Sequence, residues 1–394
     1  MRWKKAIALF LGLMLITTTL SFGRVSAEET SVTVILVSDN EADCALARYL
    51  ANVTGAVVVM TTWGVYDPNV TAEIMSYAPD EVIIIGGPEA VVEEYVNDLQ
   101  ELGITVERWG GQNRYETNLM VMTQAQIKFG LKFKDKLIMV PGNDTAGIKA
   151  ALKIAVRERA MIAFVNETTN VTKLMLKLQV RTGNVTIVGT PFMNRTLLRV
   201  REQLRNQSRE CNCTSVHVNI TAEIALEAIN AGEEKISTAK ALLENATLTP
   251  MQERLVERML TLAEKELSEA KEAYSEGKYG KAYGMAIAAK AHAEFVIRIA
   301  SSDWSMRMGL NPMMRANVTL HRLEAQIRVL ENAGIDVSEL KSLVEQLKVA
   351  IQNNDVEMVN ALLMKIEESL RELFMGGKSH LKAHAMPFAR GGAP

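Results

Sequence analysis

The densest group of polar, aromatic and glycine residues lies between Arg108 and Thr117, where the sequence reads RWGGQNRYET. Arginine guanidinium groups form paired hydrogen bonds with phosphate or carboxylate groups. Trp109 and Tyr115 offer flat apolar rings on which a sugar can stack. These residue types, at this spacing, are typical of a pocket for an anionic or sugar-containing ligand.

A structural role explains the same residues and is the favoured interpretation. Gly110 and Gly111 suit a turn, and Asn113 suits the N-cap of a helix that begins near Arg114. Both arginines would then bind backbone carbonyl or carboxylate groups at a domain boundary. The two interpretations remain open at the level of sequence.

Enzymatic patterns are weak elsewhere. The sequence contains neither G-x-S-x-G nor H-E-x-x-H. Gly142–Lys149 superficially resembles a phosphate loop, but Ala150 stands where Ser or Thr would hold magnesium. Three cysteines and His217 do not complete a zinc site. We therefore expect no catalytic residues, no metal site and no cofactor.

Composition bounds the class of protein. The 394 residues suffice for two or three domains, and 48% are hydrophobic, so a buried core is possible. The formal net charge is −2, and the chain has no long basic run. A mildly acidic chain of this kind is a poor candidate for nucleic-acid binding.

The N-terminus has the pattern of a secretory signal peptide. Basic residues precede an apolar stretch from Ala6 to Leu20, and a small-x-small cleavage pattern ends at Ala27. An uncleaved anchor is the alternative, although the stretch is short for a membrane span. We expect an exported mature chain from Glu28, with no membrane-spanning segment.

Asn-x-Ser/Thr sequons are frequent, and ten of the twelve lie before residue 222. Such sites carry bulky, solubilising glycans on the surface of exported proteins. Asn184 and Asn219 lie in apolar, strand-like runs and are the least convincing. The abundance favours an archaeal cell surface. The predicted glycosylation sites are Asn52, Asn69, Asn143, Asn166, Asn170, Asn194, Asn206, Asn212, Asn245 and Asn317.

Cysteine is scarce, with Cys44, Cys211 and Cys213 alone. Three cysteines are too few for a disulfide scaffold. In an oxidising compartment, one bridge from Cys44 to Cys211 or Cys213 is expected.

Short apolar runs recur at an offset of 103 residues, which indicates a tandem duplication. Each unit alternates such runs with helical patterns, as in parallel sheets buried on both faces. We predict strand–helix three times per unit, in an open, mostly parallel α/β sheet. The matched runs are 33–40 with 136–143, 56–60 with 160–165, and 81–88 with 184–191.

Beyond Thr221 the pattern becomes helical. Apolar residues recur at 3-4-3-4 spacing, as in Leu320, Leu323, Ile327 and Leu330, which predicts a helical bundle. Breaks are expected at 249–250, 277, 311–312, 334 and 353–354. The last 19 residues are rich in Gly and Pro, which favours disorder. The predicted segments are 1–27 (signal peptide), 28–128 and 129–221 (α/β repeats), 222–375 (helical bundle) and 376–394 (disordered tail).

The Arg108–Thr117 cluster resembles the Arg-x-x-Gly-x-Asp-Arg-Tyr-x-Thr signature of the cell wall-binding repeat 2 family, with Asn113 in place of Asp. The run 83–90 resembles the strand, Gly-Gly pair and helix start of that family. The resemblance covers residues 31–128 well and 135–220 loosely. It identifies as candidate binding positions Gly86, Gly87, Arg108, Gly111, Arg114, Tyr115 and Thr117.

The resemblance implies an exported surface protein that attaches non-covalently to anionic envelope polymers, usually through three modules. Only two modules are visible, and the second has Thr190 where the family has Gly, so oligomerisation or a different ligand is implied. We expect a non-catalytic envelope protein whose repeats bind a surface polymer or surface layer, with the helices as spacer or assembly element. The alternative is an extracellular small-ligand receptor that uses the sheet edge; an envelope-modifying enzyme is a third, less favoured reading.

Overall fold

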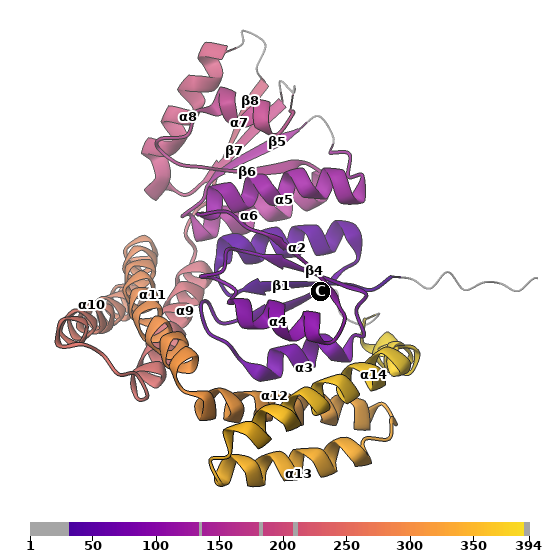
Figure 1. Cartoon of the computed structure of the whole chain (residues 1–394). Helices are drawn as coiled ribbons and strands as arrows, with labels where there is room; N and C mark the ends of the chain where they lie inside the picture. Colours follow the sequence, from indigo (N-terminus) through magenta and orange to yellow (C-terminus); the bar gives the residue numbers. More distant parts are fainter. Residues whose placement is uncertain (1–30, 134–135, 181–183, 208–211, 390–394) are drawn as a thin grey trace, which may run out of the picture. The chain divides into compact units, whose positions relative to one another are not determined.

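The computed structural model describes residues 31–133, 136–180, 184–207 and 212–389 (Figure 1). The predicted signal peptide and Cys211 lie outside these ranges. The described residues confirm the predicted fold class, because two α/β units built on parallel sheets precede a helical region.

The first repeat contains a four-stranded parallel sheet in the order β2-β1-β3-β4. Its apolar strands are buried, and helices cover both faces, as a parallel sheet requires. The strands are Thr33–Ser38 (β1), Val57–Thr61 (β2), Glu81–Ile85 (β3) and Thr105–Trp109 (β4). The helices are Glu41–Thr54 (α2), Pro68–Ser76 (α3), Glu93–Glu101 (α4) and Arg114–Phe129 (α5).

The second repeat has the equivalent order, β6-β5-β7-β8. Val34 pairs with Val82 in the first sheet, and Leu137 pairs with Val185 in the second, so the register recurs at the predicted offset of 103. The strands are Leu137–Pro141 (β5), Met161–Val165 (β6), Asn184–Gly189 (β7) and Asn212–His217 (β8). The helices are Thr145–Glu158 (α6), Val171–Lys177 (α7), the 3-10 turn Pro191–Met193 (η1) and Asn194–Gln207 (α8).

Each sheet has a fourth strand that the sequence pattern did not predict. Both β4 and β8 lie at a sheet edge and are partly or largely exposed. An edge strand needs no continuous apolar run, because one side of it faces solvent. The apolar pattern identified the edge strands β2 and β6 along with the central strands, and it misses β4 and β8 because their sequences, TVERW and NCTSVH, are more polar.

The two repeats share one hydrophobic cluster rather than two separate cores. The buried side chain of Asn118 on α5 donates to Ile162 O at 3.0 Å and accepts from Phe164 N at 2.9 Å, both on β6. Tyr49 on α2 donates its hydroxyl proton to Ala160 O at 2.7 Å. These bonds satisfy buried backbone groups of the second repeat with side chains of the first.

In the described part of the chain, six helices follow the repeats, and they break at the predicted positions. Their apolar stripes are buried, including all four residues of the Leu320 stripe. The helices are Ala222–Leu243 (α9), Pro250–Ser275 (α10), Tyr279–Leu310 (α11), Pro312–Asn332 (α12), Ser338–Gln352 (α13) and Val356–Ala389 (α14).

The helices form two groups by their hydrophobic contacts. Helices α9, α10 and α11 share a cluster into which Ala146 of the second repeat inserts. Helices α12, α13 and α14 share a cluster with β1, β3, α3 and α4 of the first repeat. The helical region is thus packed on the repeats. These contacts do not agree with a spacer that projects freely from them.

The predicted disorder of residues 376–394 is wrong for the described part of that segment. Gly376 to Ala389 continue α14, where Leu381 is 2% exposed. A Cβ at Gly377 would overlap Ile335, so glycine here permits close packing. Lys382 Nζ lies 2.9 Å from Asp80 Oδ2, which also accepts from Val32 N at 2.9 Å. The Gly-rich composition indicated disorder, whereas at Gly377 the glycine permits a close helix contact.

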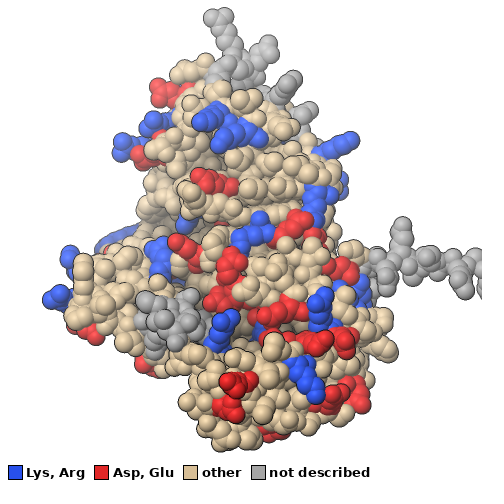
Figure 2. All heavy atoms as spheres, viewed as in Figure 1, with Lys and Arg blue, Asp and Glu red and all other residues tan. Residues whose placement is uncertain are grey.

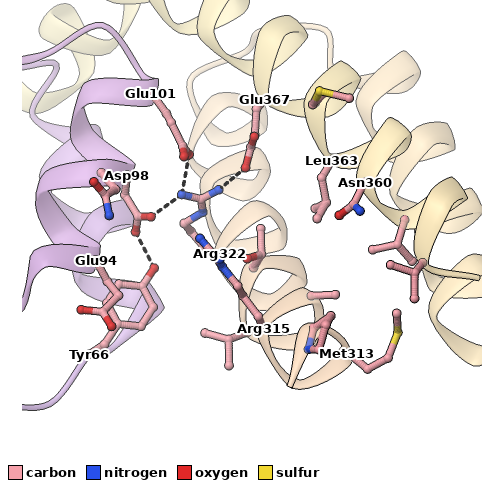
Figure 3. Close-up of a pocket in the computed structure, with 18 residues that line it drawn as sticks. Tyr66, Glu94, Asp98, Glu101, Met313, Arg315, Arg322, Asn360, Leu363 and Glu367 are labelled. Atoms are coloured by element: carbon pink, nitrogen blue, oxygen red, sulfur yellow. Dashed lines mark hydrogen bonds and ion pairs between the residues drawn. The ribbon is translucent and has the colours of Figure 1, made fainter. Parts of the chain in front are cut away.

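A buried ion network joins α12 to the first repeat (Figure 3). Arg322, whose side chain is 5% exposed, pairs with Asp98 and reaches Glu101 Oε2 at 2.8 Å. Its Nη2 lies 2.7 Å from Glu367 Oε1 of α14. Tyr66 donates its hydroxyl proton to Asp98 from the opposite side. Burial raises the pKa of both Asp98 and Glu367, and the nearby guanidinium opposes that shift.

Arg322→Ala should lower the free energy of unfolding by about 3–5 kcal/mol, because it leaves Asp98 buried without its cation. Lys341→Ala is the matched control, since its pair with Glu331 is half exposed and should contribute less than about 1 kcal/mol. Urea unfolding at pH 7 measures both. Equal midpoints for the two variants would contradict a dominant role for the buried network.

Candidate functional site

The carboxyl ends of β3 and β4 meet at a turn that requires glycine. Gly86 has a φ of +126°, a conformation that side chains disfavour. A Cβ at Gly110 would overlap Gly86 O, and a Cβ at Gly111 would overlap Glu116. The predicted glycine positions therefore allow two backbone segments to approach closely.

Arg108 is bonded inside this turn. Its Nη1 donates to Gly86 O at 3.2 Å and to Val91 O at 2.8 Å. Its Nη2 lies 3.0 Å from Glu93 Oε1. The guanidinium thus holds the loop after β3 against β4, which is the structural role that the sequence favoured.

A hollow of about 780 Å³ lies beside the turn and is lined by Gly87, Arg108 and Gly111, together with residues of α5 such as Met120. Its other charged lining residues are Glu89 and Glu116. The structure therefore brings three of the seven predicted binding residues to one hollow. Its acidic residues outnumber Arg108, so it does not offer the excess positive charge expected for an anionic ligand.

The remaining predicted residues lie elsewhere. Arg114 Nη1 donates to Gly142 O of the second repeat at 2.7 Å, and Tyr115 lies against the same glycine. Thr117 is 2% exposed, and its Oγ1 accepts from Gly111 N at 3.1 Å. Asn113 caps α5, as predicted, by accepting from Tyr115 N and Glu116 N. These residues fix the turn and the boundary between the repeats.

The predicted sugar-stacking surface is absent from this cluster. Trp109 is 3% exposed, donates Nε1–H to Glu107 Oε2 at 3.1 Å, and packs edge-on against Phe129. Tyr115 is half-buried against the shared core. Both rings serve packing, because Phe129 of α5 covers Trp109, and Tyr115 lies against Gly142 and the shared core.

The predicted bridge from Cys44 is not formed. Cys44 is a buried free thiol on α2, with its Sγ 3.6 Å from Met60 Sδ. Cys213 is disulfide-bonded, and Cys211 lies outside the described residues. Cys44 on α2 and Cys213 on β8 are far apart in sequence, although α2 and Cys213 both contact the shared hydrophobic cluster.

The predicted glycosylation sites are accessible. Nine of the ten asparagines are exposed, and Asn166 is half-buried where its Oδ1 accepts from Thr168 N. Asn184 and Asn219 are exposed as well. Exposed asparagines can be glycosylated, and glycosylation at these sites stays a prediction.

Helices α9 and α11 contact the carboxyl edge of the first sheet. Lys235, 8% exposed, pairs with Asp39, and Lys290, 7% exposed, pairs with Glu41. Small ligands of open α/β sheets bind at this edge. Its occupation by lysines of the same chain disfavours the small-ligand receptor. Two lysines in alanine-rich helices gave no sequence signal for this role.

Helix α11 contacts the second repeat too. Tyr283 Oη accepts from Ala146 N at 3.1 Å, and its ring centroid lies 5.8 Å from that of Phe192. Phe192 also lies beside Gly280 and Gly284, where the helix presents no side chain. One helix therefore binds both repeats.

Asp43 is the most perturbed carboxyl group near the turn. It is 7% exposed, and its Oδ1 has no hydrogen-bond partner among the described residues. Burial raises the pKa of Asp43 to about 6, against the opposing charge of Arg114.

In the ranges that the structure describes, no three His, Cys, Asp or Glu side chains are grouped to hold a metal ion. None of the helices in those ranges is both long and apolar enough for a transmembrane span.

Arg108→Ala should lower the free energy of unfolding by about 2–3 kcal/mol, because two carbonyl groups lose a charged donor. Arg157→Ala, whose side chain is 72% exposed, is the control and should change it by less than about 0.5 kcal/mol. Urea unfolding is the measurement. Unchanged stability of Arg108→Ala would contradict the structural role and favour the predicted role of Arg108 in ligand binding.

Asp43→Asn should stabilise the protein above pH 6. A raised pKa in the folded state means that wild-type stability increases as the pH falls from about 6 to 4. At neutral pH the buried charge costs roughly 3 kcal/mol. Thermal midpoints of the wild type and the variant should therefore differ by a nearly constant amount above about pH 6 and approach each other as the pH falls from about 6 to 4. Parallel profiles would refute the assignment; Glu368→Gln, an exposed site, is the control.

No protein-family model matches the chain. Two curated proteins are similar to parts of it. Uncharacterised protein MJ0755 of Methanocaldococcus jannaschii is 35% identical over 192 residues, which cover 48% of this chain and 55% of that protein. N-acetylmuramoyl-L-alanine amidase LytC of Bacillus subtilis is 25% identical over 169 residues, 42% of this chain and 33% of that protein. The chain thus matches about half the length of the first relative and a third of the second.

Two solved structures have a partial likeness. Cwp8 from Clostridium difficile has a TM-score of 0.39 and 22% identity, covering 48% of this chain and 31% of that chain. Cwp6 from Clostridium difficile has a TM-score of 0.38 and 20% identity, covering 47% of this chain and 29% of that chain.

Proposed function

We propose that this chain is an exported, N-glycosylated protein of the cell envelope that attaches non-covalently, through its α/β repeats, to a surface polymer or surface layer, and that it catalyses no reaction. The observation that best supports this proposal is the duplicated parallel sheet with one shared core. The similarity to LytC, named for its action on N-acetylmuramoyl-L-alanine, supports an envelope location. It covers a third of that enzyme, which is compatible with a shared binding region.

The helical region has a supporting role in this proposal. Lys235 and Lys290 bind the carboxyl edge of the first sheet, and Arg322 binds α4. Tyr283 of α11 binds the second repeat at Ala146. These contacts hold the repeats in a fixed arrangement. A fixed arrangement favours a binding protein, because little conformational freedom remains to be lost on association.

The first test is co-sedimentation of the mature chain from Glu28, with its glycans, with envelope fragments of its source. We expect retention that falls as salt rises, and no release of soluble amino sugars. Failure of the protein to sediment at low salt would refute attachment. Release of amino sugars would refute the absence of catalysis.

A pair of variants tests the hollow beside the Arg108 turn. Thr123 lines it from α5, whereas Ile127, one turn along the same helix, is 71% exposed and does not. Because the hollow lacks an excess of positive charge, Thr123→Trp should fill it without reducing retention, and Ile127→Trp should leave retention unchanged too. A several-fold loss of retention in folded Thr123→Trp alone would place attachment at the hollow.

A further inference from the structure

The outer helices of the two repeats occupy equivalent positions. Helices α3 and α4 follow β2 and β3 in the first repeat, and α7 and α8 follow β6 and β7 in the second. Because the strand order is the same, each pair covers the corresponding face of its sheet. Their surfaces are therefore comparable position by position.

The charge of these two faces is reversed. Helices α3 and α4 carry five acidic residues and no basic one. Helices α7 and α8 carry one acidic residue, Glu202, and six basic ones. We call the latter surface the basic face; its basic residues are Lys173, Lys177, Arg195, Arg199, Arg201 and Arg205. Figure 2 shows Lys and Arg prominent over the second repeat, at the top of the view, while Asp and Glu are frequent over the first.

The acidic face is matched by the chain itself. Arg322 of α12 binds Asp98 and Glu101 of α4, and the apolar residues of α3 and α4 join the cluster of α12–α14. The basic face has no such cover: no described residue of α7 or α8 belongs to the hydrophobic clusters of the helical region.

Most cations of the basic face have no described partner. Arg195 lies 3.5 Å from Glu167, with 85% of its side chain exposed, and Arg201 donates to Ser215 Oγ at 2.6 Å. Lys173, Lys177, Arg199 and Arg205 are exposed, and no ion pair joins them to another described residue. Unpaired cations this dense raise the local positive potential in a chain that is acidic as a whole.

We propose that the basic face binds an anionic polymer, a chain of repeated phosphate, sulfate or carboxylate groups, and that it is the surface through which the proposed envelope attachment takes place. Charge complementarity argues for an anionic polymer. The equivalent acidic face is neutralised by Arg322 of the same chain, whereas most cations of the basic face have no described anion beside them. The sequons Asn170, Asn194 and Asn206 lie at the ends of α7 and α8. Glycans there would hold a flat bilayer away, whereas a flexible polymer can pass between them.

The test compares two sets of charge reversals in the full mature chain. One set is Lys173→Glu, Lys177→Glu, Arg199→Glu and Arg205→Glu. The control set is Arg254→Glu, Arg258→Glu, Lys265→Glu and Arg328→Glu, all exposed and on the helical region. Both sets change the net charge equally, so an effect of overall charge affects them alike. Circular dichroism and thermal midpoints establish that each variant is folded.

The probes are dextran sulfate and uncharged dextran of the same length. Wild-type protein and the control set should bind dextran sulfate alone, with affinity that falls steeply between 50 and about 300 mM salt as charges are screened. The basic-face set should bind at least tenfold more weakly and with a shallower salt dependence. Equal losses in both sets, or equal binding of uncharged dextran, would overturn the proposal.

Two further outcomes separate this inference from the proposed function. If the folded basic-face variant still sediments with envelope fragments as the wild type does, envelope attachment stands and the basic face is not its site. If the wild type binds vesicles with anionic lipid but not dextran sulfate, the face is a membrane-binding surface and the polymer assignment is wrong.

Discussion

A parallel sheet must be covered on both faces, and this constraint governs the arrangement of the whole chain. In the first repeat, α2 and α5 cover one face and continue into the core of the second repeat. Helices α3 and α4 cover the other face, and their own outer surface packs on α12–α14. The helices that cover the sheet have outer apolar surfaces of their own, which must also be buried. The second repeat buries one of these surfaces and α12–α14 bury the other.

Sequence reasoning succeeded where burial leaves a periodic pattern. The buried strands, the stripe at Leu320 to Leu330 and the cap at Asn113 follow from spacing and residue type alone. It failed where a residue's role depends on a distant partner. Trp109 looked exposed because nothing local indicates that α5 and Phe129 cover it. Lys235, Lys290 and Arg322 are ordinary helix residues until the fold places carboxylates beside them.

The candidate site shows the same division. The turn glycines were predictable from residue type, although their reasons differ: Gly86 has a positive φ, whereas a side chain at Gly110 would overlap the backbone of Gly86. The partners of the Arg108 guanidinium were not predictable, since an arginine that binds carbonyl groups and one that binds a ligand look the same in the sequence. The basic residues of α7 and α8 can be read from the sequence. That they form the counterpart of an acidic surface follows only from the shared topology, which makes α7 and α8 equivalent to α3 and α4.

Asp80 joins the beginning and the end of the described fold. It accepts from Val32 N just before the first strand and pairs with Lys378 and Lys382 in the last helix. Tension applied between these two segments would therefore be carried partly by this carboxylate and partly by the buried residues of α14, such as Phe374 and Leu381. The repeats and helices between the two segments form a loop that the contact with Asp80 closes.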